Sequence, residues 1–345
     1  MKQRISGFFE ERIDLTVLRK WVKEKSVPQH KHSFWYYFGG LALFLITVQI
    51  ITGILLALYY SPTPANANSS VRYIMENVKY GWLIRSIHFW GANFLVAVVF
   101  IHMFSTYFMK AYRKPREMMW VLGVLILLLV LGFTFTGYLL PWTTLSYFAT
   151  KVGVNTPSVM PFFGKFITDL LQGGRGVGAS TLTRMFTMHV VVLPLLAIVL
   201  ISLHVLLSQV FGSSVPLSQR GRTGATRFFP DFLMRDAAVW AGGFAILLAM
   251  VTVFPASLGQ KVNPILPAPL GIKPEWYFLF VFETLRRFPE TIAIGAITLG
   301  IIIWLLVPFI DRRASREQKS PFFTLFGAAV LIYIISMTLI AYATT

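Results

Sequence analysis

The sequence predicts an all-α integral membrane protein with seven transmembrane helices. Of its 345 residues, 56% are hydrophobic and 13% are charged, whereas soluble globular chains have about 45–50% apolar and about 25% charged residues. A helix needs roughly 20 mainly apolar residues to cross the ~30 Å hydrocarbon layer of a membrane. Seven segments meet this requirement: 34–60, 83–109, 118–140, 185–211, 237–256, 291–310 and 322–342. The same composition excludes a disordered chain, a collagen-like repeat and a nucleic-acid-binding domain.

The distribution of basic residues predicts the orientation of the chain. The net charge is +17, from 31 Lys and Arg against 14 Asp and Glu, and such a balance by itself fits a polyanion partner. In membrane proteins, however, basic residues concentrate in cytoplasmic loops. A cytoplasmic N-terminus places 20 of the Lys and Arg residues on that side and 11 on the other. We therefore expect a cytoplasmic N-terminus and an outer C-terminus.

The segments between the spans divide the chain into four parts. The predicted parts are an amphipathic surface helix at 1–32, a four-helix module at 33–211, a cytoplasmic connection at 212–236 and a three-helix module at 237–345. The first part mixes charges with apolar residues at helical spacing, which is typical of a helix lying on a membrane, and it does not resemble a secretory signal peptide. The outer loops 141–184 and 257–290 are long enough to indicate a functional role.

Four of the six histidines fall inside predicted spans, where an ionisable residue indicates function. His88 and His102 lie in the second span and His189 and His204 in the fourth, 14 and 15 residues apart. These spacings separate each pair by roughly 21–22 Å along its helix. Because the two spans run in the same direction, His88 and His189 share an outer level, and His102 and His204 share an inner one. Each level can supply both axial ligands of a haem iron. A single histidine bonded to a neighbouring helix is the simpler alternative, but it does not explain two matched pairs.

Glycines in the first and third spans repeat the spacing of 14 residues. Gly39 and Gly123 are expected at the inner histidine level, and Gly53 and Gly137 at the outer one. A porphyrin between four helices needs positions without a side chain. Small residues also serve ordinary helix packing in membranes, but the agreement of both levels on both helices favours haem clearance.

Two arginines lie close to the outer histidine level. Arg85 and Arg184 precede the outer histidines by three and five residues. A guanidinium at this position can pair with a haem propionate, or it can anchor its helix at the membrane surface. The sequence leaves both interpretations open.

The second long outer loop contains Pro274-Glu275-Trp276-Tyr277, which places a carboxylate and a phenol between two apolar spans. A quinol loses two protons when it is oxidised, and a carboxylate whose pKa is raised by partial burial is a suitable acceptor. Taken alone, the tetrapeptide also fits an aromatic belt at the membrane surface with one snorkelling acid.

Together these features resemble cytochrome b of the bc-type quinol oxidoreductases over nearly the whole chain. The resemblance rests on the histidine pairs, the paired glycines, Gly137-Tyr138-Leu139-Leu140-Pro141-Trp142 and the Glu275 tetrapeptide. The chloroplast-type bf branch is the most similar, through Phe9-Glu10-Glu11-Arg12, Gly81-Trp82-Leu83-Ile84-Arg85-Ser86, Lys114-Pro115-Arg116-Glu117, Thr181-Leu182-Thr183-Arg184 and the second histidine spacing of 15. Residues from about 230 onward resemble that branch's separate subunit four, here fused into the same chain.

The resemblance implies a di-haem cytochrome b subunit of a quinol:cytochrome c oxidoreductase that runs a Q-cycle. Quinol oxidation is expected at an outer site formed by Tyr138 and Pro274–Tyr277, with Glu275 receiving a proton. One electron is expected to reach a Rieske iron-sulfur protein and then a c-type cytochrome. The other is expected to cross the membrane through two b-type haems and reduce quinone at the cytoplasmic side, which generates proton-motive force. The resemblance also implies a homodimer within a multisubunit complex, in a bacterial inner membrane.

Two departures limit what the resemblance implies. The bf branch holds an extra haem by a cysteine just before the Gly-Gly of the first span, where this chain has Tyr37. Because the chain contains no cysteine, we expect no covalent third haem. After His204 the chain reads Val205-Leu206-Leu207-Ser208-Gln209 in place of the basic residues of that branch, so the residues of the inner quinone site are left unassigned.

Two other protein classes compete with this interpretation. Di-haem membrane anchors of hydrogenases, formate dehydrogenases and nitrate reductases also use intramembrane histidines, but the Glu275 tetrapeptide, the long outer loops and the three extra spans are not expected in them. A transporter or a structural membrane protein fits the hydropathy and the charge bias. It leaves the matched histidine and glycine levels to coincidence.

Overall fold

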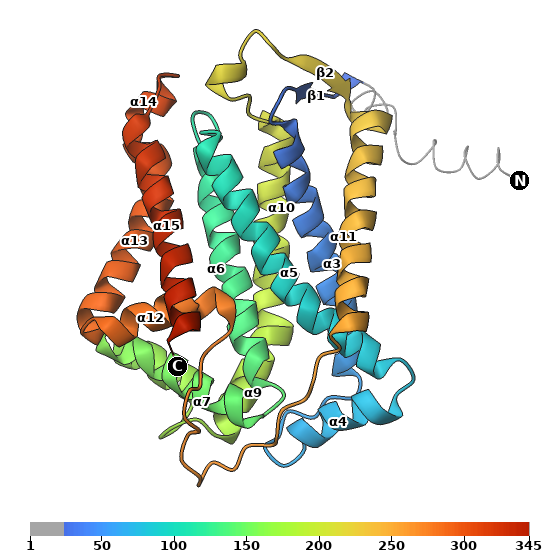
Figure 1. Cartoon of the computed structure of the whole chain (residues 1–345), viewed down its shortest axis with the longest axis vertical. Helices are drawn as coiled ribbons and strands as arrows, with labels where there is room; N and C mark the ends of the chain where they lie inside the picture. The colour runs from blue at the N-terminus through green and yellow to red at the C-terminus, as the bar shows by residue number, and fades with distance from the viewer. Residues whose placement is uncertain (1–23, 345) are drawn as a thin grey trace, which may run out of the picture.

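The computed structural model describes residues 24–344, and within this range seven helical segments are long and apolar enough to cross a membrane. The long helices are α3 (Tyr37–Ala57), α5 (Gly81–Phe108), α6 (Glu117–Leu139), α10 (Leu193–Phe211), α11 (Leu233–Val253), α13 (Glu290–Ile310) and α15 (Pro321–Ala343). They run side by side as one bundle (Figure 1). The predicted all-α fold with seven spans is confirmed.

Shorter elements cover the two ends of the bundle. The short helices are α4 (Ala67–Asn77), α7 (Thr144–Asn155), α8 (Gly164–Gln172), α9 (Ala179–Thr187), α12 (Leu279–Arg287) and α14 (Arg312–Ser315). Single turns of 3-10 or π helix are η1 (Ser33–Tyr36), η2 (Thr156–Val159), η3 (Met188–Val192), η4 (Leu217–Gln219), η5 (Phe228–Phe232) and η6 (Trp276–Phe278). We call the end with α4, α7 and α12 the outer end, following the predicted orientation, and the opposite end the inner end (Figure 1).

The fourth and fifth spans begin six and nine residues earlier than the sequence predicts, at 179 and 228 rather than 185 and 237. The fourth runs over Ala179–Phe211, because the π turn η3 joins α9 to α10 without a break. This turn ends two residues before Pro194, which lacks the N–H that an α-helical turn needs. The fifth runs over Phe228–Val253 rather than starting at 237. Charged residues in its first turns lower the local hydropathy, so the predicted connection 212–236 is longer than the observed one.

The sequence did not predict a small β-ribbon at the inner end. Strand β1 (Ser26–Gln29) pairs antiparallel with β2 (Gly224–Arg227). Pro28 is tolerated there because a two-stranded ribbon leaves outward backbone positions unpaired. Most of the surface helix predicted for residues 1–32 lies outside the described residues. Within its described part, the strand β1 replaces the expected helix.

The first four spans and the fifth share one apolar core. Leu45 of α3, Val96 of α5 and Leu247 of α11 are fully buried in it. Close approach of the backbones depends on small residues, as is usual between membrane helices. Gly243 of α11, for example, lies against the side chain of Leu41. This packing fixes α11 against α3 and α5.

A polar joint at the inner end connects the first four spans to the last two. Asp311, at the end of α13, is buried and accepts hydrogen bonds from Tyr112 Oη at 2.7 Å and Ser320 Oγ at 2.8 Å. Beside it, the ring of Tyr107 stacks on Trp304 with centroids 4.4 Å apart. Tyr112 and Asp311 are almost 200 residues apart in the sequence, and so are Tyr107 and Trp304. These contacts therefore fix the two halves of the chain relative to each other.

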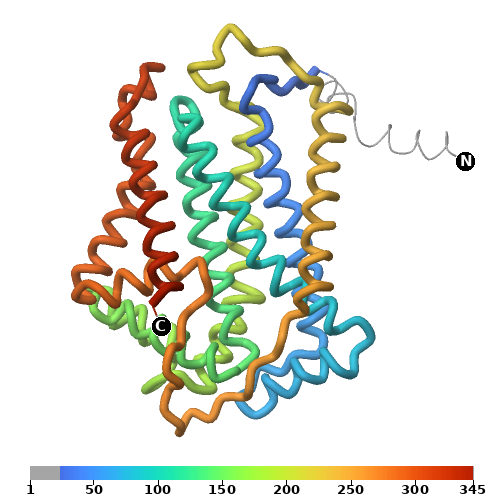
Figure 2. The backbone as a smooth tube through the Cα atoms, in the orientation of Figure 1, coloured from blue at the N-terminus to red at the C-terminus, as the bar shows by residue number. Residues whose placement is uncertain are grey.

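The outer loops are held by hydrogen bonds to loop carbonyls. Tyr60 Oη donates to the Leu140 carbonyl at 2.7 Å, and Asn68 Nδ2 donates to the Pro141 carbonyl at 3.0 Å. Thr143 and Ser146 form a capping box that starts α7. The long segment between α11 and α12 then crosses the outer end of the bundle to reach the last two spans (Figure 2).

Replacing Asp311 by Ala is expected to lower the free energy of unfolding by about 2–4 kcal/mol, because three buried donors, Tyr112 Oη, Ser320 Oγ and the Ala314 N–H, lose their acceptor. Thermal unfolding of the purified protein in detergent measures the loss. Asp231→Ala is the matched control, since Asp231 and its partner Arg227 are exposed and 4.0 Å apart, and such pairs are worth about 0–1 kcal/mol. An equal loss in both variants would contradict the role given to the joint.

Candidate functional site

The outer histidine pair lies between α5 and η3. The ring centroids of His88 and His189 are 6.2 Å apart and their planes are inclined by 75°. An iron bound to two imidazole nitrogens, each about 2 Å away, requires centroids roughly 6 Å apart. His88 Nδ1 lies 2.9 Å from Thr52 Oγ1, and His189 Nδ1 lies 3.1 Å from both the Phe133 carbonyl and Thr136 Oγ1. With Nδ1 engaged by the protein, Nε2 is the nitrogen left for a metal.

The inner histidine pair lies between α5 and α10. His102 and His204 are close enough for a charge on one ring to act on the other. Their Nδ1 atoms are buried and have no partner in hydrogen-bond geometry among the described residues. The carbonyl of Met119 faces the ring of His204. A buried polar nitrogen without a partner is costly, so the Nδ1 atoms of the inner rings are less well satisfied than those of the outer rings.

Each of the four histidine rings faces one glycine. A Cβ built on these glycines would meet the Cε1 atom of the ring: Gly53 and His88 at 3.3 Å, Gly137 and His189 at 2.6 Å, Gly39 and His102 at 3.1 Å, and Gly123 and His204 at 3.4 Å. The glycines therefore lie at the inner and outer levels that their spacing predicts. They clear space for the imidazole rings, whereas their spacing in the sequence predicts clearance for the porphyrin. Two imidazoles in a side-chain-free cradle at each level fit one b-type haem per level.

The structure gives both outer arginines backbone partners. Arg85 donates to the carbonyls of Ala256 at 2.5 Å and Ser257 at 3.0 Å. Arg184 donates to the carbonyls of Asp169 at 3.0 Å and Leu170. Both therefore anchor outer loops to the bundle. A guanidinium has five N–H donors, so each arginine keeps N–H groups that are not used by these carbonyls.

Three of the five residues predicted for the outer quinol site come together. Glu275 is half-buried at the start of η6, and burial raises the pKa of its carboxyl. Tyr277 is 5% exposed, and burial together with the charge of Glu275 raises the pKa of its phenol. Its hydroxyl contacts Thr134 of α6, and Tyr138 on the same helix lies within electrostatic reach of Glu275. One carboxylate and two phenols thus gather in a poorly hydrated place.

The other two predicted residues support this cluster from its sides. Trp276 Nε1 donates to Asn93 Oδ1 on α5 at 3.0 Å, which ties the loop to the histidine-bearing helix. Pro274 restricts the backbone directly before Glu275. The structure therefore gives Trp276 and Pro274 places beside the cluster.

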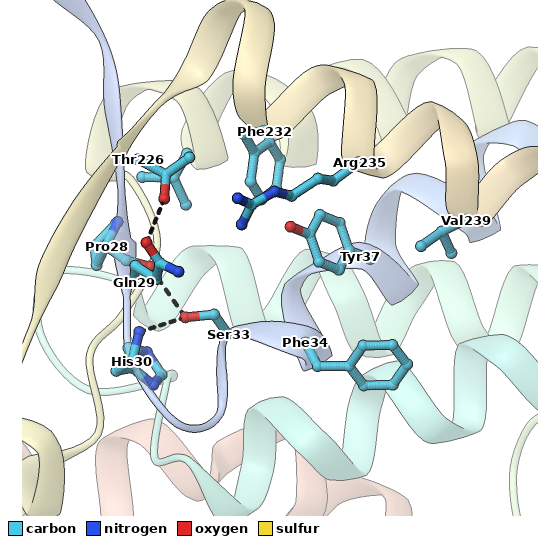
Figure 3. A pocket seen from close by; sticks show the side chains of 11 residues that line it. Pro28, Gln29, His30, Ser33, Phe34, Tyr37, Thr226, Phe232, Arg235 and Val239 are labelled. Carbon is cyan, nitrogen blue, oxygen red and sulfur yellow. Dashed lines mark hydrogen bonds between the residues drawn. The ribbon is translucent and has the colours of Figure 1, made fainter.

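A cavity of about 270 Å³ at the inner end is a feature that the sequence analysis does not predict. It lies between β1, the start of α3 and the start of α11, and Figure 3 shows that Tyr37 reaches it from α3 and Arg235 from α11. The ring of Tyr37 stacks on Phe232 with centroids 5.0 Å apart. Gly39, two residues after Tyr37, faces His102 of the inner histidine pair. The sequence feature that points to this cavity is a basic residue, Arg235, in the first turns of the fifth span.

A hydrogen-bonded chain borders this cavity. The His32 backbone N–H donates to His30 Nδ1 at 3.1 Å, and Tyr36 Oη donates to the Ser214 carbonyl at 2.9 Å. His30 Nε2 lies 2.5 Å from Tyr36 Oη and must act as the donor there, since the hydroxyl proton is already used. Burial and the charge of His32 lower the pKa of His30. These hydrogen bonds therefore hold the imidazole of His30 in its neutral form at the wall of the cavity.

Comparisons with known proteins agree with this geometry. Residues 22–212, which include all four ligand-type histidines, match the family described as Cytochrome b/b6/petB. Residues 261–345, which include the Glu275 tetrapeptide, match the family described as Cytochrome b(C-terminal)/b6/petD. The chain resembles a solved chain of a hyperthermophilic respiratory Complex III with a TM-score of 0.81 and 29% identity, over 98% of both chains.

Two relatives are similar in sequence. The cytochrome bc complex cytochrome b subunit of Chlorobaculum thiosulfatiphilum is 50% identical over 350 aligned residues, which cover 99% of this chain and 82% of that protein. Cytochrome b6 of Gloeobacter violaceus is 42% identical over 214 residues, 62% of this chain and 99% of that protein. These matches exclude the membrane-anchor and transporter classes. The chain therefore belongs to the cytochrome b family, joins a cytochrome b/b6 part to a petD-like part, and is the cytochrome b subunit of a bc-type complex.

Proposed function

We propose that this subunit oxidises quinol at the outer face, passes one electron of each quinol across the membrane and returns it to quinone at the inner face. The observation that carries the proposal is the pair of histidine levels in one bundle, each with its two glycines, between the Glu275 cluster and the inner cavity. Two redox centres at these depths connect the two membrane faces, and a site for quinone at each end completes a Q-cycle.

The four histidines would hold two b haems. His88 and His189 would bind the outer iron, and His102 and His204 the inner one. A b haem supplies reversible one-electron chemistry at each level. Thr52, Phe133 and Thr136 support this assignment, because their contacts to Nδ1 orient the outer imidazoles. Arg85 and Arg184 lie where their remaining N–H groups could bond propionates.

The Glu275 cluster would receive quinol at the outer face. Glu275 accepts a proton as quinol is oxidised, and Tyr277 and Tyr138 shape the pocket around the reacting hydroxyl. The raised pKa of Glu275 brings the carboxylate closer to the pKa of its donor, which favours proton transfer. The partners that follow from this role are a Rieske iron-sulfur protein, which takes the other electron, and a c-type cytochrome.

The inner cavity would bind the ring of the quinone that is reduced. Its volume of about 270 Å³ suits a small ring better than a whole lipid-tailed molecule. Arg235 offers a cation to an oxygen that gains negative charge on reduction. Tyr37 fills the place of the cysteine of the bf branch and stacks on Phe232, which supports the expectation of no covalent third haem.

The placement of the complex follows from the same proposal. Basic residues gather at the inner end, and we assign that end to the cytoplasm of a bacterium. The protons of quinol oxidation then leave at the outer face, which generates proton-motive force. We further propose that two copies of this subunit pair within the complex.

The purified complex is expected to contain two b-type haems for each copy of this chain. A dithionite-reduced minus oxidised spectrum with pyridine haemochrome quantification measures them. His88→Ala and His204→Ala should each lower the content from two toward one, since each change removes one axial ligand. His32→Ala, outside both levels, should keep the wild-type content. A well-folded preparation without haem would overturn the proposal.

Gly137→Ala is expected to perturb the outer haem more than Gly123→Ala perturbs the inner one. A methyl group at Gly137 would come within 2.6 Å of the His189 ring, whereas at Gly123 it would lie at an ordinary 3.4 Å from His204. Haem content and the low-temperature spectrum of the reduced protein compare the two variants. Equal spectra would show that the ring of His189 has room to move.

Glu275→Gln is expected to slow quinol oxidation by roughly 100-fold or more, with both haems retained, because the amide cannot accept the proton. The pKa of Glu275 is raised by burial, so the wild-type rate should rise with pH above the ordinary carboxyl range, and the variant should lose this rise. Steady-state quinol oxidation from low to neutral pH measures both effects. Glu290→Gln, exposed at the start of α13, is the control. Wild-type turnover of Glu275→Gln would remove this residue from the proton path.

A further inference from the structure

The side chain of Lys273 reaches the carboxyl end of the last helix, α15. Its Nζ donates to the carbonyls of Ala341 and Thr344, both at 2.6 Å. The last carbonyls of a helix have no partner within the helix and carry partial negative charge. The last turn of α15 contains no basic residue of its own. A lysine from another segment therefore supplies the cation at this helix end.

Only one residue separates Lys273 from Glu275, and it is a proline. Pro274 fixes its own φ and restricts the backbone of Lys273 to extended conformations. Glu275 then starts η6, where its carbonyl accepts from the Phe278 N–H at 2.9 Å. With so few free torsions between them, the position of the Lys273 backbone determines where the Glu275 carboxylate can lie.

The loop that precedes Lys273 gives no comparable support. Ile265 is 92% exposed and Leu270 is fully exposed. Among the described residues, the hydrogen bonds made by 263–272 stay within this stretch and join Asn263 to Ile265 and Leu266. Lys273 is therefore the first residue upstream of Glu275 that is bonded to the bundle after this exposed stretch.

Helix α15 also holds the segment that follows Glu275. Thr284 Oγ1 of α12 lies 2.6 Å from the hydroxyl of Tyr333 on α15, and α12 packs along this helix. The same helix thus supports the Glu275 segment at both ends. Trp276, bonded to Asn93, connects it to α5 in between.

We propose that Lys273 is a positioning residue of the outer quinol site: its ammonium, bonded to the carboxyl end of α15, holds Glu275 beside Tyr277 and Tyr138. The inference rests on the function proposed for Glu275. It adds a requirement for a positive charge at a residue that touches neither quinol nor haem. Tyr138 and Tyr277 are the titratable groups that face Glu275.

The test compares Lys273→Met, Lys273→Arg and Lys273→Gln in the complete complex. Lys273→Met is expected to raise the KM for quinol or lower kcat roughly three- to tenfold. It should also move the rise of rate with pH toward lower pH, since a carboxylate that shifts toward water loses the effect of burial. Lys273→Arg should restore both, because a guanidinium also bonds helix-end carbonyls. Lys165→Met removes an exposed outer lysine and is the matched control.

Haem spectra of every variant separate this inference from the proposed function. Intact haem spectra with altered KM, kcat and pH profile in Lys273→Met support the positioning role. Wild-type kinetics and pH profile with intact spectra overturn it and leave the proposal for Glu275 untouched. An equal effect in Lys165→Met, or no rescue by arginine, overturns the specific ionic role. If Lys273→Met does not assemble, Lys273→Gln applies the same criteria with a neutral side chain that can still donate a hydrogen bond.

Discussion

Imidazole rings inside an apolar helix bundle need room and hydrogen-bond partners that the neighbouring helices must supply. Every ring of the two histidine levels lies against a glycine of α3 or α6, so the spacing of these helices from α5, η3 and α10 is set at four points. At the outer level, Thr52 and Thr136 add hydroxyl groups that reach the rings. The packing of the first four spans therefore follows from the demands of four polar side chains in a low-dielectric environment.

The last three spans depend on this bundle and complete its outer site. At the inner end, Asp311 joins the α13–α15 part to Tyr112 in the loop between α5 and α6, and Trp304 joins it to Tyr107 near the end of α5. At the outer end, Trp276 bonds Asn93 on the helix that carries His88 and His102. In the bf branch, to which the chain is similar, these parts are separate proteins. Here the contacts at both ends hold the fused parts in register, and the Glu275 cluster forms where they meet.

The two ends of the molecule offer different chemistry, as the proposed function requires. The outer cluster offers a half-buried carboxylate between phenols, an environment that accepts protons. The inner cavity offers a guanidinium and a phenol, with a neutral histidine held in its wall by a chain of hydrogen bonds. An acceptor of protons at one face and a cation at the other suit the two opposite half-reactions of the proposed Q-cycle.

Helical periodicity let the sequence by itself determine the spans, the two histidine levels and the matching glycines, because along a helix the number of residues fixes both depth and face. It also determined that Glu275 and Tyr277 share a short motif. Only the tertiary structure decided the carbonyl partners of Arg85 and Arg184, the pairing of β1 with β2, the inner cavity and the contact of Lys273 with α15. Each of these joins groups whose positions depend on how the chain folds back on itself. Backbone carbonyls, which accept many of these bonds, are present at every residue, so no side-chain pattern can indicate which of them will be used.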